Sequence, residues 1–75
     1  MFKSVTFEVV GEPRLHCENC EQRVERMLMG VTGVKQVRAQ ARDQRIEVLF
    51  DSSALQPAAI AERLDQAGYE IRIQS

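Results

Sequence analysis

The only two cysteines and the only histidine of this chain stand together in the stretch LHCENC, residues 15–20. Cys17 and Cys20 are separated by two residues, so both sulfurs can face one ion or each other. Thiolates are soft ligands that favour Cu(I) and other thiophilic ions. Cu(I) accepts two or three ligands, whereas a closed structural zinc site uses four. The pattern therefore favours an open soft-metal site over structural zinc.

Two other interpretations of the cysteine pair remain open. A C-x-x-C pair is also the motif of thiol–disulfide oxidoreductases, although here Glu-Asn separates the cysteines and the chain contains no tryptophan. Both cysteines can instead be small buried residues, which suits Cys20 better than Cys17. We expect His16 to be a solvated loop residue; the alternative is a third ligand or a neighbour that titrates near neutral pH.

The hydrophobic pattern predicts the elements that position this stretch. Alternation predicts strands over residues 3–10, 34–41 and 46–50, the last two joined by a polar turn at Asp43-Gln44, and a short final strand at 71–73. Helical spacing predicts helices from about residue 18 to 29 and from Pro57 to Gly68. The order βαββαβ predicts an α+β, ferredoxin-like sandwich: a four-stranded antiparallel sheet with two helices on one face. Cys17 then lies in a strand-to-helix loop and Cys20 in the first helical turn, where the helix dipole lowers a thiol's pKa.

Length and composition limit the classes of protein that the chain can be. Its 75 residues make one domain, 1–75. Ten basic and eleven acidic residues give no electrostatic reason to bind nucleic acid or an anionic membrane. No apolar run approaches the ~20 residues that span a bilayer, and no secretion signal is present. We expect a cytoplasmic protein, and a free-standing one because Met1 leads directly into the first predicted strand.

Several features together resemble the heavy-metal-associated domain family. This family includes small copper chaperones, the metal-binding modules of P1B-type transport ATPases and periplasmic mercury-binding proteins. The resemblance spans nearly the whole chain. It rests on the C-x-x-C after the first strand, Gly33-Val34 before the second, Phe50-Asp51 at the end of the third, and Ala67-Gly68-Tyr69 after the second helix.

The resemblance implies roles for individual residues. Cys17 and Cys20 would be the metal ligands, and Tyr69 would lie beside them, as a core aromatic, a contact of the ligands or a third ligand. Leu15 occupies the place of the family's methionine, which is buried under the metal loop, and the exchange nearly conserves volume. Arg14 occupies the place of a glycine, which predicts a loop that needs no positive φ at this residue.

The function that the resemblance implies is transfer of a metal ion without catalysis. We expect a monomeric Cu(I) chaperone that delivers copper to a P1B-type ATPase by thiolate ligand exchange; a metal-bridged dimer is an alternative. A Zn(II)-, Cd(II)- or Hg(II)-binding protein and a small thiol–disulfide oxidoreductase are the rival functions. Met27 and Met29 are expected to pack in the core or on the surface. The charged residues of the first helix are expected to form a solvated face that can steer docking: Glu21, Arg23, Glu25 and Arg26.

Overall fold

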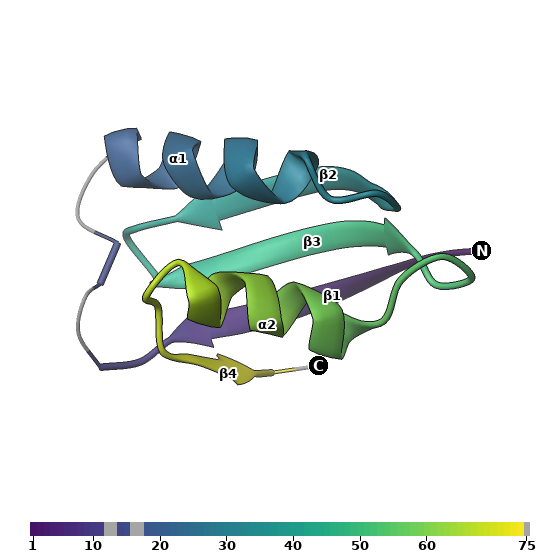
Figure 1. Cartoon of the computed structure of the whole chain (residues 1–75). Helices are drawn as coiled ribbons and strands as arrows, with labels where there is room; N and C mark the ends of the chain where they lie inside the picture. The colour runs from purple at the N-terminus through teal and green to yellow at the C-terminus, as the bar shows by residue number, and fades with distance from the viewer. Residues whose placement is uncertain (12–13, 16–17, 75) are drawn as a thin grey trace.

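The computed structural model describes residues 1–11, 14–15 and 18–74, with the side chain of residue 18 left out. Its elements are β1 (Phe2–Val9), α1 (Glu18–Met29), β2 (Val34–Gln40), β3 (Arg45–Asp51), α2 (Pro57–Gln66) and β4 (Ile71–Ile73). The strands form one sheet in the order β2-β3-β1-β4, and all neighbouring strands are antiparallel. Both helices cover the same face of this sheet (Figure 1). The predicted ferredoxin-like fold is confirmed.

The core lies between the sheet and the two helices. Alternate residues of the two central strands point into it, as their period of two predicted: Val5, Phe7 and Val9 from β1, and Ile46, Val48 and Phe50 from β3. The register places Val5 opposite Val48 and Phe7 opposite Ile46, so large apolar side chains meet across the strands. The helices complete the core with their inner stripes: Val24, Leu28, Ile60 and Leu64. Among the described residues, no polar or charged side chain is buried.

The outer edge of β2 is covered by carboxylates from α1. Glu25 Oε2 accepts a hydrogen bond from the Ala39 amide at 3.0 Å, and Glu21 Oε2 accepts one from the Ala41 amide at 2.6 Å. The expectation that these two glutamates belong to a solvated face was therefore wrong. An edge strand has unpaired N–H groups that invite pairing with another chain, and the carboxylates satisfy two of them.

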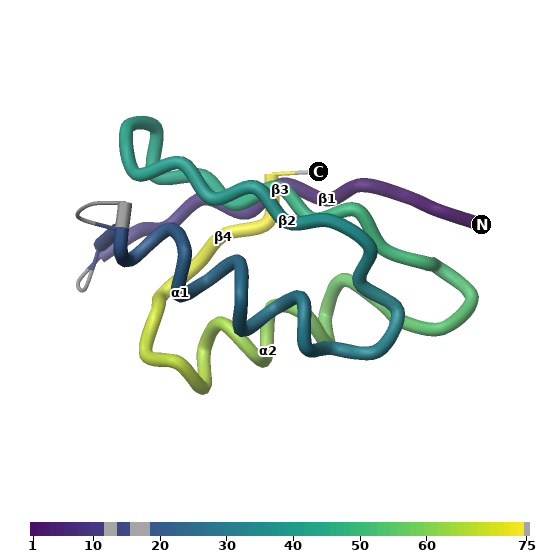
Figure 2. Tube along the Cα trace, turned by 90° about the horizontal axis from the view of Figure 1, so that it is seen from above, coloured from purple at the N-terminus to yellow at the C-terminus, as the bar shows by residue number. Residues whose placement is uncertain are grey.

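The molecule is elongated, measuring 32 × 20 × 20 Å along its principal axes. Seen from above, the β2–β3 turn and the start of α1 lie at one end, and the N-terminus lies at the other (Figure 2). No helix in the described part of the chain has both the length and the apolar character needed to cross a membrane.

We predict that Glu25→Ala lowers the free energy of unfolding by about 1 kcal/mol, because the variant leaves the Ala39 amide without its acceptor. Glu25→Gln retains an acceptor and should lose less. Glu62→Ala is the matched control, because Glu62 is an exposed glutamate of the other helix. Urea unfolding measures all three, and an equal loss in Glu25→Ala and Glu62→Ala would contradict the prediction.

Candidate metal centre

The start of α1, the β2–β3 turn and the α2–β4 loop lie at one end of the molecule (Figures 1 and 2). Of the predicted site residues, Cys20 and Tyr69 are described by the structure, whereas His16 and Cys17 lie outside the described residues. Their roles in metal binding therefore remain predictions.

Leu15 attaches the cysteine-bearing loop to the core. Its side chain is only 2% exposed and belongs to the core cluster, which confirms the predicted packing role. Its main chain is also held, because Gln44 Oε1 accepts a hydrogen bond from the Leu15 amide at 2.9 Å and Gln44 Nε2 donates one to the Leu15 carbonyl at 2.6 Å. The sequence predicted Gln44 only as a turn residue and gave no sign of this contact.

The prediction for Arg14 is also confirmed. Among the described residues, Gln44 is the only non-glycine with a positive φ, so Arg14 does not need the conformational freedom of a glycine. Its exposed side chain adds a positive charge to this end of the molecule.

Cys20 is the third residue of α1 and is half-buried against the core. The first-turn amides of a helix lack intrahelical acceptors and, with the helix dipole, favour a negative charge. Soft metal ions bind the thiolate form of cysteine. In the part of the chain that the structure describes, no three His, Cys, Asp or Glu side chains cluster to hold a metal ion.

A Schellman motif at the end of α2 places Tyr69. Gly68 has φ +98, the Gly68 amide donates to the Asp65 carbonyl at 2.9 Å, and the Tyr69 amide donates to the Leu64 carbonyl at 3.0 Å. The chain then turns inward, so Tyr69 packs in the same core cluster as Leu64 and is 8% exposed. Tyr69 is thus a core aromatic, which was one of the roles predicted for it.

Tyr69 also interacts electrostatically with Cys20. The pKa of the phenol is raised above 10.0, first because burial disfavours the phenolate and second because the Cys20 charge repels it, while the Arg23 guanidinium acts in the opposite direction. The fold therefore brings Tyr69, Cys20 and Arg23 within electrostatic reach, although the tyrosine lies 49 positions after the cysteine in the sequence.

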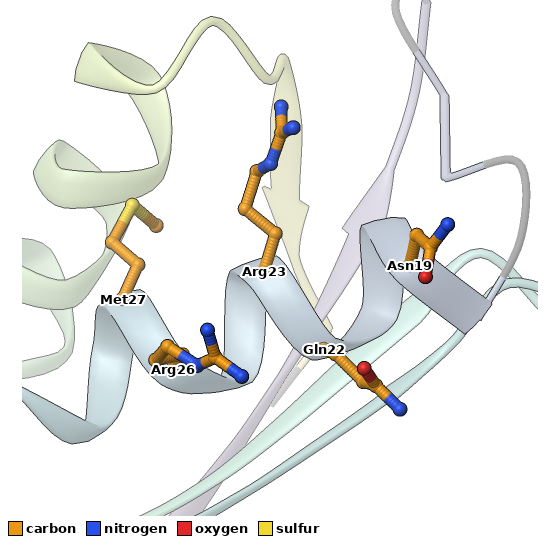
Figure 3. A pocket seen from close by; sticks show the side chains of 5 residues that line it. All are labelled: Asn19, Gln22, Arg23, Arg26 and Met27. Carbon is orange, nitrogen blue, oxygen red and sulfur yellow. The ribbon is translucent and has the colours of Figure 1, made fainter.

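Arg23 borders an open depression on α1. This depression, of about 450 Å³, is lined by Asn19, Gln22, Arg23, Arg26 and Met27. Arg23 and Met27 point from α1 toward the side of α2 (Figure 3). Arg23 and Arg26 are exposed, as predicted. Met27 packs partly buried against the core and Met29 is exposed, in agreement with the expected packing roles.

We predict that the phenol of Tyr69 titrates above pH 10.0, its ordinary value, because burial and the Cys20 charge both oppose ionisation. Cys20→Ser should lower the midpoint and Arg23→Gln should raise it. Ultraviolet absorbance measures the phenolate without interference, because the chain has one tyrosine and no tryptophan. An unchanged midpoint in Cys20→Ser would contradict the electrostatic contact.

The same shift in pKa has a defined effect on stability. The folded state holds the phenol proton more tightly than the unfolded state does. The stabilising contribution is fully present below a pH of about 10 and declines as the pH rises through the folded-state pKa. Tyr69→Phe should remove this dependence, which urea unfolding at a series of alkaline pH values can measure.

Comparison with known proteins agrees with this arrangement. Residues 6–70 match the model of the heavy-metal-associated domain. The chain is 28% identical to the copper chaperone CopZ of Enterococcus hirae over 67 residues, which cover 89% of this chain and 93% of that protein. It is 33% identical over 64 residues to the copper-transporting ATPase RAN1 of Arabidopsis thaliana, covering 85% of this chain but only 6% of the ATPase.

Solved structures show the same fold. A copper-binding domain from HMA7, a P-type ATPase, superposes with a TM-score of 0.84 at 29% identity, covering 96% of this chain and 93% of that one. The N-terminal domain of ZntA in its Zn(II) form superposes with a TM-score of 0.81 at 25% identity, covering 96% and 92%. With the match over residues 6–70, the chain belongs to the heavy-metal-associated domain family.

Proposed function

We propose that this protein binds Cu(I) through the thiolates of Cys17 and Cys20 and delivers it to a P1B-type transport ATPase. The observation that carries the proposal is the position of Cys20 in the first turn of α1, beside a loop anchored by Leu15. The likeness to a copper chaperone over 89% of the chain and to a copper-binding ATPase domain supports the choice of ion and partner.

The proposed transfer exchanges ligands and changes no oxidation state. Two thiolates leave Cu(I) open to a further sulfur ligand. A thiolate of the partner enters, the ion is shared for a time by sulfurs of both proteins, and the bonds to Cys17 and Cys20 then break. Only metal–sulfur bonds form and break, so the protein is a carrier and not an enzyme. The thiols must stay reduced, which fits action in the cytoplasm.

The charged surface near Cys20 supports docking at this end. Three arginines are exposed there. Arg14 lies before α1 in the chain, and Arg23 and Arg26 lie on α1. Complementary charges across an interface raise the rate of encounter and fix orientation more than they raise affinity. A partner that presents carboxylates around its own thiols would meet this surface favourably.

Zinc is the second candidate cargo, and the ZntA domain in its Zn(II) form favours it. Cd(II) and Hg(II) are further ions that a thiolate pair accepts. The donor set of two sulfurs matches the low coordination number of Cu(I) better than the four ligands that zinc usually takes. Zinc would need ligands in addition to the two cysteines, and His16 is the nearest one in the sequence.

We predict that the reduced protein binds Cu(I) far more tightly than Zn(II) when each ion is titrated against a competing chelator. Cys17→Ala and Cys20→Ala should each weaken Cu(I) binding by more than roughly 100-fold, because each removes a direct ligand. Loss of a residue that only contacts a ligand typically costs up to about 100-fold. Ser53→Ala, in a turn outside the site, is the control. Comparable affinities for the two ions would overturn the assignment of copper.

His16→Ala distinguishes the two roles of the histidine. A solvated His16 leaves Cu(I) affinity unchanged between about pH 5 and 8, the range in which imidazole titrates. This unchanged affinity is the expected result. A loss of affinity in His16→Ala that grows with pH would instead show that the neutral imidazole is a ligand.

A further inference from the structure

Gln44 adopts a backbone conformation that a glutamine rarely occupies. It has φ +54 at the end of the β2–β3 turn, immediately before β3. Its carbonyl accepts a hydrogen bond from the Val9 amide at 2.8 Å, so the turn is tied to the end of β1. Glycine and asparagine adopt a positive φ more readily than glutamine does. A strained residue at such a place motivates a search for what its side chain does.

The Gln44 side chain makes three hydrogen bonds to main-chain atoms. Its Oε1 accepts from the Leu15 amide at 2.9 Å, and its Nε2 donates to the Leu15 carbonyl and to the Ala41 carbonyl, both at 2.6 Å. The amide therefore satisfies both main-chain polar groups of Leu15 at once. It also joins the loop before α1 to the β2–β3 turn across 29 residues of sequence.

Only an amide of this length fits these contacts. A carboxylate at the same place could accept from the Leu15 amide but could not donate to either carbonyl. Asparagine would tolerate the positive φ, but its side chain is one methylene shorter. The Leu15 side chain is buried at the same point, so side chain and main chain of one residue are both fixed.

We propose that Gln44 is a positioning residue for metal capture. By holding the main chain of Leu15, it fixes a point two residues before Cys17 in the sequence before the ion arrives. This inference rests on the proposed function and adds to it a residue outside the cysteine motif. Fixing the main chain close to a ligand in advance reduces the entropy lost on binding and strengthens the complex. The contact supports the ligands without touching the ion.

Variants of Gln44 can separate the attachment of Leu15 from overall stability. Gln44→Gly removes the amide but suits the positive φ, so the turn and the fold should remain. Gln44→Glu keeps the length and one acceptor but loses both donors. Asp43→Ala is the matched control, because Asp43 is the exposed neighbour of Gln44 in the same turn.

The experiment compares these variants with the unchanged protein in three measurements. Amide hydrogen exchange by NMR follows the Leu15 amide against the Ala39 amide, which is held by Glu25 instead. Transfer of Cu(I) to a chelator gives the dissociation rate and the affinity, and urea unfolding gives the overall stability. In Gln44→Gly we expect faster exchange at Leu15 alone and Cu(I) affinity reduced by roughly 10-fold, the scale of contacts that orient a ligand. Gln44→Glu should have a Cu(I) affinity between those of Gln44→Gly and the unchanged protein. Asp43→Ala should match the unchanged protein in all three measurements.

The outcomes identify which statement fails. If Gln44→Gly exchanges faster at Leu15 but binds and releases Cu(I) as before, the positioning role is overturned while the proposed function stands. If affinity falls only in proportion to overall stability, with Leu15 and Ala39 affected equally, the positioning role is also overturned. If the unchanged protein binds no Cu(I) through its cysteines, the proposed function fails and the inference fails with it.

Discussion

Burial of Leu15 is the constraint on which the candidate site depends. The neighbouring strands and helices are held by the shared core, but the described residues between β1 and α1 belong to no regular element. A loop needs its own attachment, and burying one leucine side chain supplies about 1.5–3 kcal/mol for it. Since Leu15 lies two residues before Cys17, the attachment is close to the predicted ligands. The Gln44 amide then fixes the orientation of the main chain at the same residue.

Helix α1 has two functions in this architecture. Its first turn carries Cys20, at the end of the helix where the dipole favours a negative charge. Its flank carries Glu21 and Glu25, which bind the edge of the sheet. The helix is therefore held at its side as well as through its apolar stripe, and this second attachment begins one residue after Cys20. At the other helix, the Schellman motif turns Tyr69 back into the core near the same cysteine.

The sequence predicted the features that repeat along the chain. Alternation located the strands because one face of the sheet is buried, and helical spacing gave the bounds of α1, Glu18–Met29, without error. The burial of Leu15 was predicted because it occupies the place of the family's buried methionine. Gln44 was not, because a hydrogen bond between a side chain and a main chain 29 residues away leaves no periodic signal. Glu21 and Glu25 were misjudged for a related reason: helical spacing shows which residues leave the core but not which flank meets an edge strand.

The N-terminus lies at the end of the molecule opposite the start of α1, the helix that carries Cys20 (Figure 1). Because the molecule is longer in one dimension than in the other two, Met1 and the cysteine-bearing end are close to its two tips. A fluorescent label, a solid support or a second protein attached at Met1 would therefore leave the cysteine end exposed. Copies joined to a common scaffold through Met1 would each present the start of α1 outward, so crowding at the scaffold would not block access to that end.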